Sequence, residues 1–155
     1  MKFLKPKFWE SKNNIPAILL RPISALFHLV ITLRKSFAST KKFKIPIICV
    51  GNIYVGGTGK TPVAIMIANN LKTNKKNPVI IKKYYKNHED EHKIINEMTN
   101  CLILDKNRAQ AIEKAERENF DMAILDDGFQ DYTIKKSLNI ICFNNRKLIG
   151  NGLVF

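Results

Sequence analysis

Cysteine is scarce in this sequence, and its distribution excludes several kinds of site. The 155 residues contain three cysteines, Cys49, Cys101 and Cys142, and each lies within an apolar run. Their number is odd and no two have the Cys-x-x-Cys spacing, so neither a disulfide framework nor a zinc ligand set is indicated. We therefore expect reduced, buried core thiols, as is typical of a cytosolic protein.

The sequence also lacks an uninterrupted apolar run long enough to cross a membrane. Residues 15–33, IPAILLRPISALFHLVITL, have the length of a span, but they contain Arg21 and the prolines Pro16 and Pro22. A charge and two prolines argue against spanning. The shorter runs that remain do not form the core of a signal peptide, and no small-residue cleavage site follows them. We expect a helical segment that lies at a membrane interface.

Acidic residues are almost absent from the first part of the chain. Residues 1–44 hold ten basic residues and one acid, Glu10, so they carry +9 of the chain's net charge of +13. Basic residues beside aliphatic and aromatic neighbours suit an amphipathic helix in the headgroup layer. The alternative is a helix that packs on its own domain with a solvated basic edge. Nucleic acid is not the expected partner, because these charges flank an apolar segment and not an open aromatic platform.

From residue 45 onward, short apolar runs alternate with helical patterns, which is typical of an α/β fold with a mostly parallel sheet flanked by helices. Strands are predicted at 45–50, 78–82, 101–104, 121–125 and 138–143, and helices at 61–72, about 90–99 and 107–118. Asn107 is a plausible cap of the third helix, with Ala109, Ile112 and Ala115 on one face. The sequence thus predicts an N-terminal segment, 1–44, and a domain, 45–155.

A candidate phosphate-binding loop follows the first predicted strand. The stretch GNIYVGGTGKTP at 51–62 runs into a predicted helix, and the candidate nucleotide-binding residues are Gly56, Gly57, Thr58, Gly59, Lys60 and Thr61. Glycines let consecutive N–H groups turn toward phosphate oxygens, at a helix N-terminus that adds partial positive charge. Lys60 would reach the β- and γ-phosphates and the Thr61 hydroxyl would bind Mg²⁺. The match lacks the usual first glycine, where Tyr54 stands, and the alternative is a simple strand-to-helix turn.

Two groups of carboxylates are candidates for the chemistry. The predicted strand at 121–125 leads into Asp126 and Asp127, the form of a Walker B element, and Asp126 can meet the Mg²⁺ held by Thr61. Turn chemistry alone also explains two adjacent acids. The triplet at 89–91, Glu-Asp-Glu, follows the second strand and offers a carboxylate that orients or deprotonates a hydroxyl; a solvated helix N-terminus explains it equally well.

These motifs resemble a known family, tetraacyldisaccharide 4'-kinase, the lipid A kinases of Gram-negative bacteria. The loop at 51–62 is similar to the phosphate loop of that family, LDDGFQ at 125–130 matches its second motif, and GNG at 150–152 looks like a third. Phe8-Trp9, the segment beginning at Pro22, and Arg34 fall where the family has its membrane-associated helix. Members of the family continue beyond the point that corresponds to Phe155, so the chain is expected to be the N-terminal part of such a kinase.

The resemblance implies an ATP- and Mg²⁺-dependent kinase that phosphorylates the 4'-hydroxyl of a tetraacyldisaccharide 1-phosphate. It places the protein at the cytoplasmic face of the bacterial inner membrane, as a peripheral or monotopic protein beside its acylated lipid substrate. By the same resemblance, Asp90 is the catalytic base, Asp126 and Asp127 lie on the Mg²⁺ side, and Gln130 lies at the rim of the active site.

Two alternatives remain. One is a membrane-docking ATPase with a deviant phosphate loop, although such proteins carry a lysine where this chain has Val55. The other is an inactive nucleotide-binding remnant of the kinase. The stretch from Lys82 to Lys86, KKYYK, favours it, because the family usually has Ser-Arg-Gly-Tyr-Gly there. Lys83 can supply the charge of the arginine but not its planar fork.

Overall fold

The structure is a computed structural model that describes residues 15–19, 21–52, 59–85 and 89–143. The chain divides into two compact units, one formed by Thr40–Cys142 and the other by Met1–Ser39 with Phe143–Phe155. The predicted boundary at residue 44 stays a prediction. Gly56, Gly57 and Thr58 of the candidate loop, and the motif at 150–152, lie outside the described residues.

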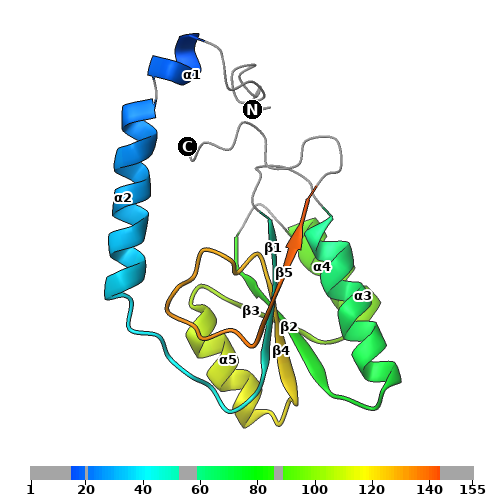
Figure 1. The fold of residues 1–155 in the computed structure, drawn as a ribbon. Helices are drawn as coiled ribbons and strands as arrows, with labels where there is room; N and C mark the ends of the chain where they lie inside the picture. Colours follow the sequence, from blue (N-terminus) through cyan, green and yellow to red (C-terminus); the bar gives the residue numbers. More distant parts are fainter. Residues whose placement is uncertain (1–14, 20, 53–58, 86–88, 144–155) are drawn as a thin grey trace. The chain divides into compact units, whose positions relative to one another are not determined.

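The larger unit is built on a parallel sheet, as the alternating sequence pattern predicts. Its strands are β1 (Ile47–Asn52), β2 (Pro78–Lys83), β3 (Leu102–Asp105), β4 (Met122–Asp126) and β5 (Leu138–Cys142) (Figure 1). Their order across the sheet is β3-β2-β4-β1-β5. All five predicted strands are confirmed, and their bounds shift by no more than two residues.

The largest shift is at β1, which begins at Ile47 instead of residue 45. Pro46 has no N–H to donate to a ladder, so only its carbonyl is used, by the Ala123 amide at 3.0 Å. At the other end the strand extends to Asn52, because β5 pairs with it there and places Gly51 opposite Ile141. The strand therefore carries the chain two residues further toward the candidate loop than the apolar pattern predicts.

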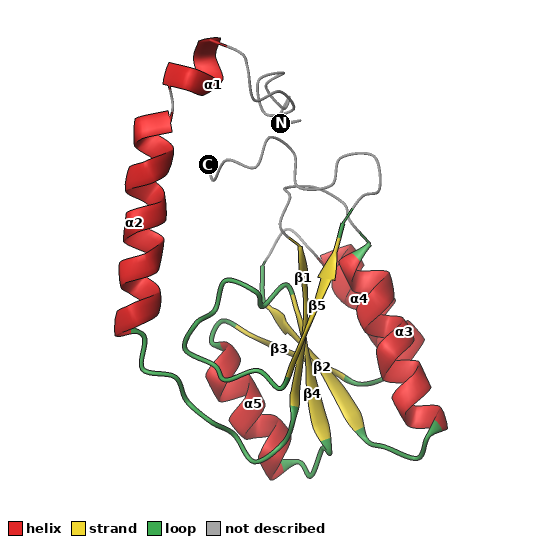
Figure 2. Ribbon diagram, viewed as in Figure 1, coloured by secondary structure: helices red, strands yellow, loops and turns green. Residues whose placement is uncertain are grey.

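Three helices cover the sheet, α3 (Lys60–Thr73) and α4 (Glu89–Thr99) on one face and α5 (Arg108–Arg117) on the other (Figure 2). The chain moves outward from β1 through β2 to β3 by way of α3 and α4. It then returns along the opposite face through α5, and this return places β4 between β2 and β1. Asn107 caps α5 as predicted, since its side-chain oxygen accepts from the Ala109 amide at 2.9 Å.

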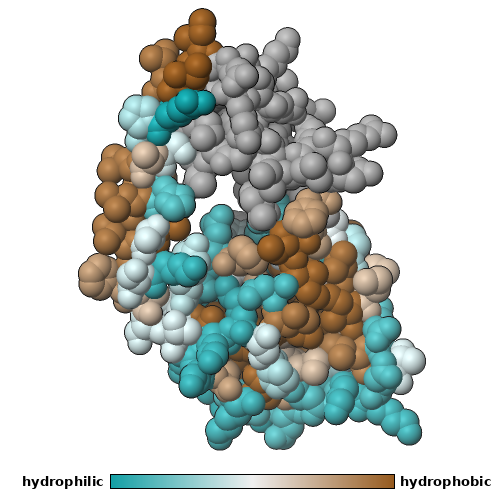
Figure 3. All heavy atoms as spheres, viewed as in Figure 1, coloured by the Kyte–Doolittle hydropathy of each residue, from teal (hydrophilic) through white to brown (hydrophobic). Residues whose placement is uncertain are grey.

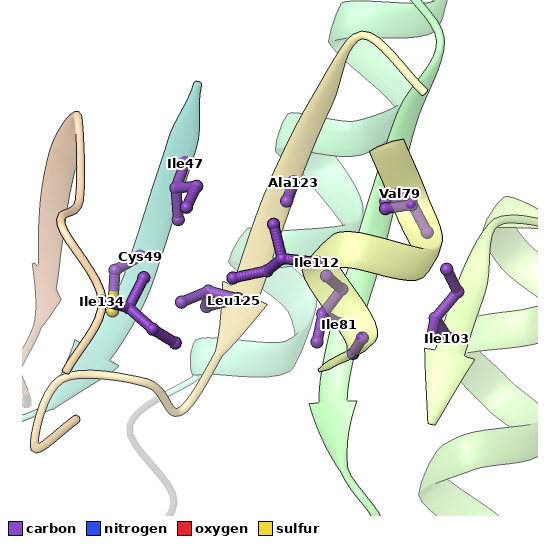
Figure 4. Packing of buried hydrophobic residues seen from close by; sticks show 11 residues of the cluster. Ile47, Cys49, Val79, Ile81, Ile103, Ile112, Ala123, Leu125 and Ile134 are labelled. Carbon is purple, nitrogen blue, oxygen red and sulfur yellow. The ribbon is translucent and has the colours of Figure 1, made fainter. Parts of the chain in front are cut away.

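The core consists of two apolar layers, one on each face of the sheet. Strand side chains alternate between them, so that Cys49 and Leu125 face α5 while Val50 and Ile124 face α3 and α4. Figure 4 shows the layer under α5, where Ile112 lies over the strands. In α5 the fully buried residues are Ala111, Ile112 and Ala115, whereas the predicted face residue Ala109 is only half-buried.

The smaller unit contains α1 (Ile15–Leu19) and α2 (Arg21–Phe37). Figure 3 shows hydrophobic residues along both helices. The exposed large apolar residues of α2 are Ile23, Leu26, Phe27, Leu29, Val30, Leu33 and Phe37. Their spacing of three and four residues places most of them on one side of the helix. Among the described residues, no helix is long and apolar enough to span a membrane.

Two isoleucines on helices test the packing of the larger unit. Ile112 on α5 is fully buried, whereas Ile94 on α4 is 50% exposed. We expect Ile112→Ala to lower the free energy of unfolding by about 2–5 kcal/mol, because it leaves a cavity under the helix. Ile94→Ala should change it by only about 0.5 kcal/mol. Urea unfolding measures both variants, and equal losses would contradict this account of the core.

Candidate functional site

The strand order brings the candidate motifs together at one edge of the sheet. β1 and β4 are neighbours, and β2 flanks β4 on its other side, so the carboxyl ends of all three meet. In this register, Asp126 is opposite Val50 on one side and opposite Lys82 on the other. By the alternation of the strands, Asp126 and Lys82 both project toward the face that α3 and α4 cover.

The N-terminus of α3 has features of an anion site. Gly59 caps the helix with φ of 77°, a left-handed conformation that favours glycine, and an added Cβ would meet nothing within 4 Å. The first turn contains no acidic residue, and no side-chain cap is found there within the described part of the chain. The N–H groups of Lys60 and Thr61 and the partial positive charge of the helix start suit a negatively charged ligand.

A cluster of four side chains lies where α3, α4, β2 and β4 meet. The Thr61 hydroxyl oxygen is 2.6 Å from Glu91 Oε1 and 3.0 Å from Asp126 Oδ2, and its single proton can be donated to only one of them at a time. The Lys82 ammonium donates to Asp126 Oδ2 at 2.6 Å and lies 3.0 Å from Glu91 Oε1. The predicted proximity of Thr61 and Asp126 is thus present.

Lys82 is charged in this cluster despite its burial. The residue is 7% exposed and Asp126 is fully buried. Burial alone would lower the pKa of the Lys82 ammonium, but the charge of Asp126 and the hydrogen bonds to Asp126 and Glu91 outweigh it, so that this pKa lies above its ordinary value. A protonated lysine therefore partly neutralises the two carboxylates.

Lys60 reaches a second group of residues at the same edge. Its ammonium donates to the side-chain oxygen of Asn52 at 3.0 Å and lies 3.4 Å from Asp127 Oδ1. Asn52 is the last residue of β1, and Asp127 follows β4 directly. The side chain of Asp127 is 60% exposed, in contrast to that of Asp126. The two acids thus lie in different surroundings, and Asp127 contacts the lysine of the loop.

The turn after β4 is held by a network that includes Arg108. Asp127 has φ of 62°, and its amide donates to the Val50 carbonyl at 2.9 Å. The Arg108 guanidinium donates to the Asp127 carbonyl at 2.5 Å and lies 3.8 Å from a carboxylate oxygen of Asp131. An added Cβ at Gly128 would lie 2.9 Å from the Leu125 Cβ, so a larger residue does not fit there.

The other two predicted catalytic residues lie outside this network. Asp90, in the first turn of α4, and Gln130, after the turn, are both exposed. Among the described residues, Asp90 has no hydrogen bond or ion pair, whereas the adjacent Glu91 contacts Thr61 and Lys82. Helical spacing could have predicted that Glu91 faces the sheet, because buried Ile95 and Thr99 follow it at four-residue intervals on the inner side of α4.

The thiols of Cys49 and Cys142 lie close enough to this site to interact electrostatically with its charged groups. All three are free thiols, with Cys49 and Cys101 buried and Cys142 half-buried. Burial raises the pKa of the Cys49 and Cys142 thiols, which favours their protonated form. The expectation of free thiols in the core is confirmed, although Cys142 is only partly covered.

The oxygen donors at the end of β4 fit a hard divalent cation. Within the described residues, Asp126 Oδ1 is buried and has no hydrogen-bond partner, and the Thr61 hydroxyl lies beside the same carboxylate. No group of three His, Cys, Asp or Glu residues that could hold a metal occurs in that part of the chain. Mg²⁺ is usually bound by one or two protein oxygens together with substrate phosphates and water, so a small donor set fits it.

A strand leading to a Gly-Lys-Thr helix start, beside a strand that ends in a buried aspartate, defines a P-loop NTPase-like domain. The sequence profile described as Tetraacyldisaccharide-1-P 4'-kinase, or LpxK, matches residues 16–155. The chain belongs to this family of kinases.

Known proteins support the same assignment. The chain is 47% identical to the tetraacyldisaccharide 4'-kinase of Pelagibacter ubique, over 99% of this chain and 48% of that protein. It is 33% identical to the corresponding kinase of Rickettsia canadensis, over 99% of this chain and 52% of that protein. A crystal structure of LpxK from Aquifex aeolicus in complex with ATP superimposes with a TM-score of 0.68 and 27% identity, covering 82% of this chain and 49% of that one. The chain spans about half the length of these relatives.

The role of Arg108 in holding the turn can be measured directly. Its side chain is 14% exposed, and Arg108→Met removes the donor to the Asp127 carbonyl. We expect a loss of about 1–3 kcal/mol in unfolding free energy in urea, together with faster amide hydrogen exchange at 127–131. Arg117→Met, at an exposed position on the same helix, is the control. Unchanged exchange at 127–131 in the Arg108 variant would contradict this role.

Proposed function

We propose that the protein represented by this chain transfers the γ-phosphate of ATP to the 4'-hydroxyl of a tetraacyldisaccharide 1-phosphate, in lipid A biosynthesis. The observation that carries this proposal is the convergence of the start of α3 with the end of β4, where Thr61 contacts Asp126 and Lys60 contacts Asp127. Membership of the kinase family and the ATP complex of the Aquifex aeolicus relative support it. In this proposal each residue of the site has a separate role.

The start of α3 would bind the triphosphate. Uncapped N–H groups of the first turn would donate to phosphate oxygens, together with the glycines at 56, 57 and 59 and the backbone of Thr58. Lys60 would exchange its contacts with Asn52 and Asp127 for the β- and γ-phosphates. A triphosphate is a stronger partner for this ammonium than a single exposed carboxylate, because it carries more negative charge.

Thr61 and Asp126 would hold Mg²⁺, with Asp127 nearby on the same side. The free, buried oxygen of Asp126 supports this assignment within the described residues. When bound, Mg²⁺ would neutralise charge on the phosphate oxygens. The protein would contribute fixed positions for the donors, since Asp126 is fully buried at the end of a central strand.

Asp90 would act as the base, accepting the proton of the 4'-hydroxyl as that oxygen bonds to the γ-phosphorus and ADP leaves. Its exposure in the first turn of α4 leaves it accessible to an incoming acceptor, and its neighbour Glu91 lies against Thr61. Gln130, also exposed, would lie at the rim of the acceptor site. These roles follow from the resemblance and from the exposed edge positions of the two residues.

Two variants separate nucleotide binding from transfer. We expect Lys60→Ala to remove most ATP-dependent activity and to weaken ATP binding, because it deletes the phosphate-binding charge. Asp90→Ala should retain ATP binding while transfer falls by about 100-fold or more, because only the base is lost. The measurement is transfer of radiolabel from ATP to the tetraacyl disaccharide 1-phosphate in detergent micelles, with equilibrium binding of ATP in parallel.

Glu97→Ala, another exposed acid of α4, is the matched control for Asp90→Ala and should transfer label normally. Equal loss of ATP affinity in the Lys60 and Asp90 variants would contradict the role of Asp90. ATP binding by the unmodified chain without any label in the lipid would favour the nucleotide-binding remnant. The absence of ATP binding would overturn the proposed site as a whole.

The exposed apolar side of α2 would contact the membrane surface that contains the lipid substrate, at the cytoplasmic face of the inner membrane. Seven large apolar side chains of this helix are between 45% and 84% exposed. Arg34 and Lys35 in its last turn add positive charge that anionic headgroups attract. A helix with this composition would keep the site beside an acylated substrate that does not leave the membrane.

Vesicle binding tests the apolar side of α2. Leu26 is 61% exposed, and Leu26→Asp should weaken binding to anionic phospholipid vesicles by at least about tenfold, because an apolar anchor is replaced by a charge. Thr32→Asp adds the same charge at an exposed position across the helix, so it controls for simple repulsion. Cosedimentation measures both variants, and equal weakening would show that electrostatics alone drives the contact.

A further inference from the structure

Lys82 is a buried cation beside the proposed metal donors. It lies at the end of β2, 7% exposed, and its ammonium contacts Asp126 Oδ2 at 2.6 Å and Glu91 Oε1 at 3.0 Å. Lysine is almost never this buried unless it is paired. Because Lys82 and Asp126 are Cα partners on adjacent strands, the backbone of the sheet fixes this pairing.

The position of the ammonium has an electrostatic consequence for the carboxylates. Asp126 and Glu91 both lie against the Thr61 hydroxyl, whose one proton can satisfy only one of them. Without Lys82 the fully buried Asp126 and the half-buried Glu91 would repel each other, and a divalent cation would be strongly attracted to them. With Lys82 in place, their charge is already partly neutralised, and the ammonium occupies the space beside the same oxygens.

We propose that Lys82 is a built-in counter-cation that holds Asp126 and Glu91 in place in the nucleotide-free protein and competes with a divalent cation for their oxygens. Free metal is thereby disfavoured at this site. A metal ion bound to phosphate groups is favoured, because the negative charge of the phosphates offsets the repulsion between the metal ion and the Lys82 ammonium. Lys82 is a positioning residue in this scheme, and the inference rests on the proposed nucleotide and metal site.

Metal binding without nucleotide tests the proposal. Lys82→Met keeps the aliphatic stem and removes the charge, and we expect it to bind Mn²⁺ at least about tenfold more tightly than the unmodified chain, as measured by electron paramagnetic resonance of free Mn²⁺. Its Tm in EDTA should fall by about 5–15 °C, and Mg²⁺ alone should restore much of that loss. The Tm of the unmodified chain should respond little to Mg²⁺.

Lys83→Met is the matched control, because Lys83 is the next residue of β2 and its ammonium lies 5.8 Å from the centre of the Tyr85 ring, away from the cluster. It should bind Mn²⁺ as the unmodified chain does. A Lys82→Met protein that folds only when Mn²⁺ or Mg²⁺ is present would also support the proposal. Unchanged Mn²⁺ affinity and an unchanged Tm response in Lys82→Met would overturn it.

A second comparison covers the case in which Lys82→Met does not fold under either condition. Glu91→Gln removes one of the two carboxylates, so adding Lys82→Met to it leaves the cluster with the same net charge as in the unmodified chain. The double variant should bind Mn²⁺ more tightly than Glu91→Gln alone, and equal affinities would overturn the proposal. None of these experiments contains nucleotide, so their results can be interpreted even if a separate measurement finds no ATP binding.

Discussion

The site depends on one constraint, the placement of β4 between β1 and β2 in the sheet. This order pairs β4 with a different strand on each side, so that Asp126, its last residue, is opposite both Val50 and Lys82. The crossover through α5 on the opposite face produces the order. If β4 lay at the outer edge, Asp126 could reach neither the start of α3 nor the lysine of β2. The helix of the proposed phosphate site and the acidic strand lie together only because the sheet makes them adjacent.

Within this frame, burial separates two acids that are neighbours in sequence. Asp126 projects toward α3 and α4 and is fully buried, which fixes its oxygens beside Thr61 and Lys82. Asp127 turns outward in a left-handed conformation. This conformation is stabilised by the hydrogen bond that its N–H donates to the Val50 carbonyl and by the guanidinium of Arg108. Asp126 is thus a fixed carboxylate in the interior, and Asp127 is an exposed partner of Lys60.

Much of the architecture could be predicted from sequence, because strand and helix patterns depend on residues close together in the chain. The short apolar runs identified all five strands, and Asn107 marked the start of α5. The glycine-lysine-threonine start of α3 identified the candidate phosphate site for a similar reason, since the chemistry lies within a few consecutive residues. The roles of Asp90 and Gln130 depend on an acceptor and remain predictions.

The tertiary structure alone decided which distant side chains meet. Lys82 and Asp126 are separated by 44 residues, and Thr61 and Glu91 by 30, so no local pattern records their contacts. In the sequence, Lys82 stands only as one of two lysines after an apolar run, and Glu91 as one of three acids. The sequence by itself determined the elements, the phosphate-loop residues and the family resemblance. The strand order places Lys82 beside Asp126, and the side of α4 that faces the sheet brings Glu91 to the same lysine. Both depend on crossover direction and packing across the whole unit, whereas helix and strand propensities depend only on nearby residues.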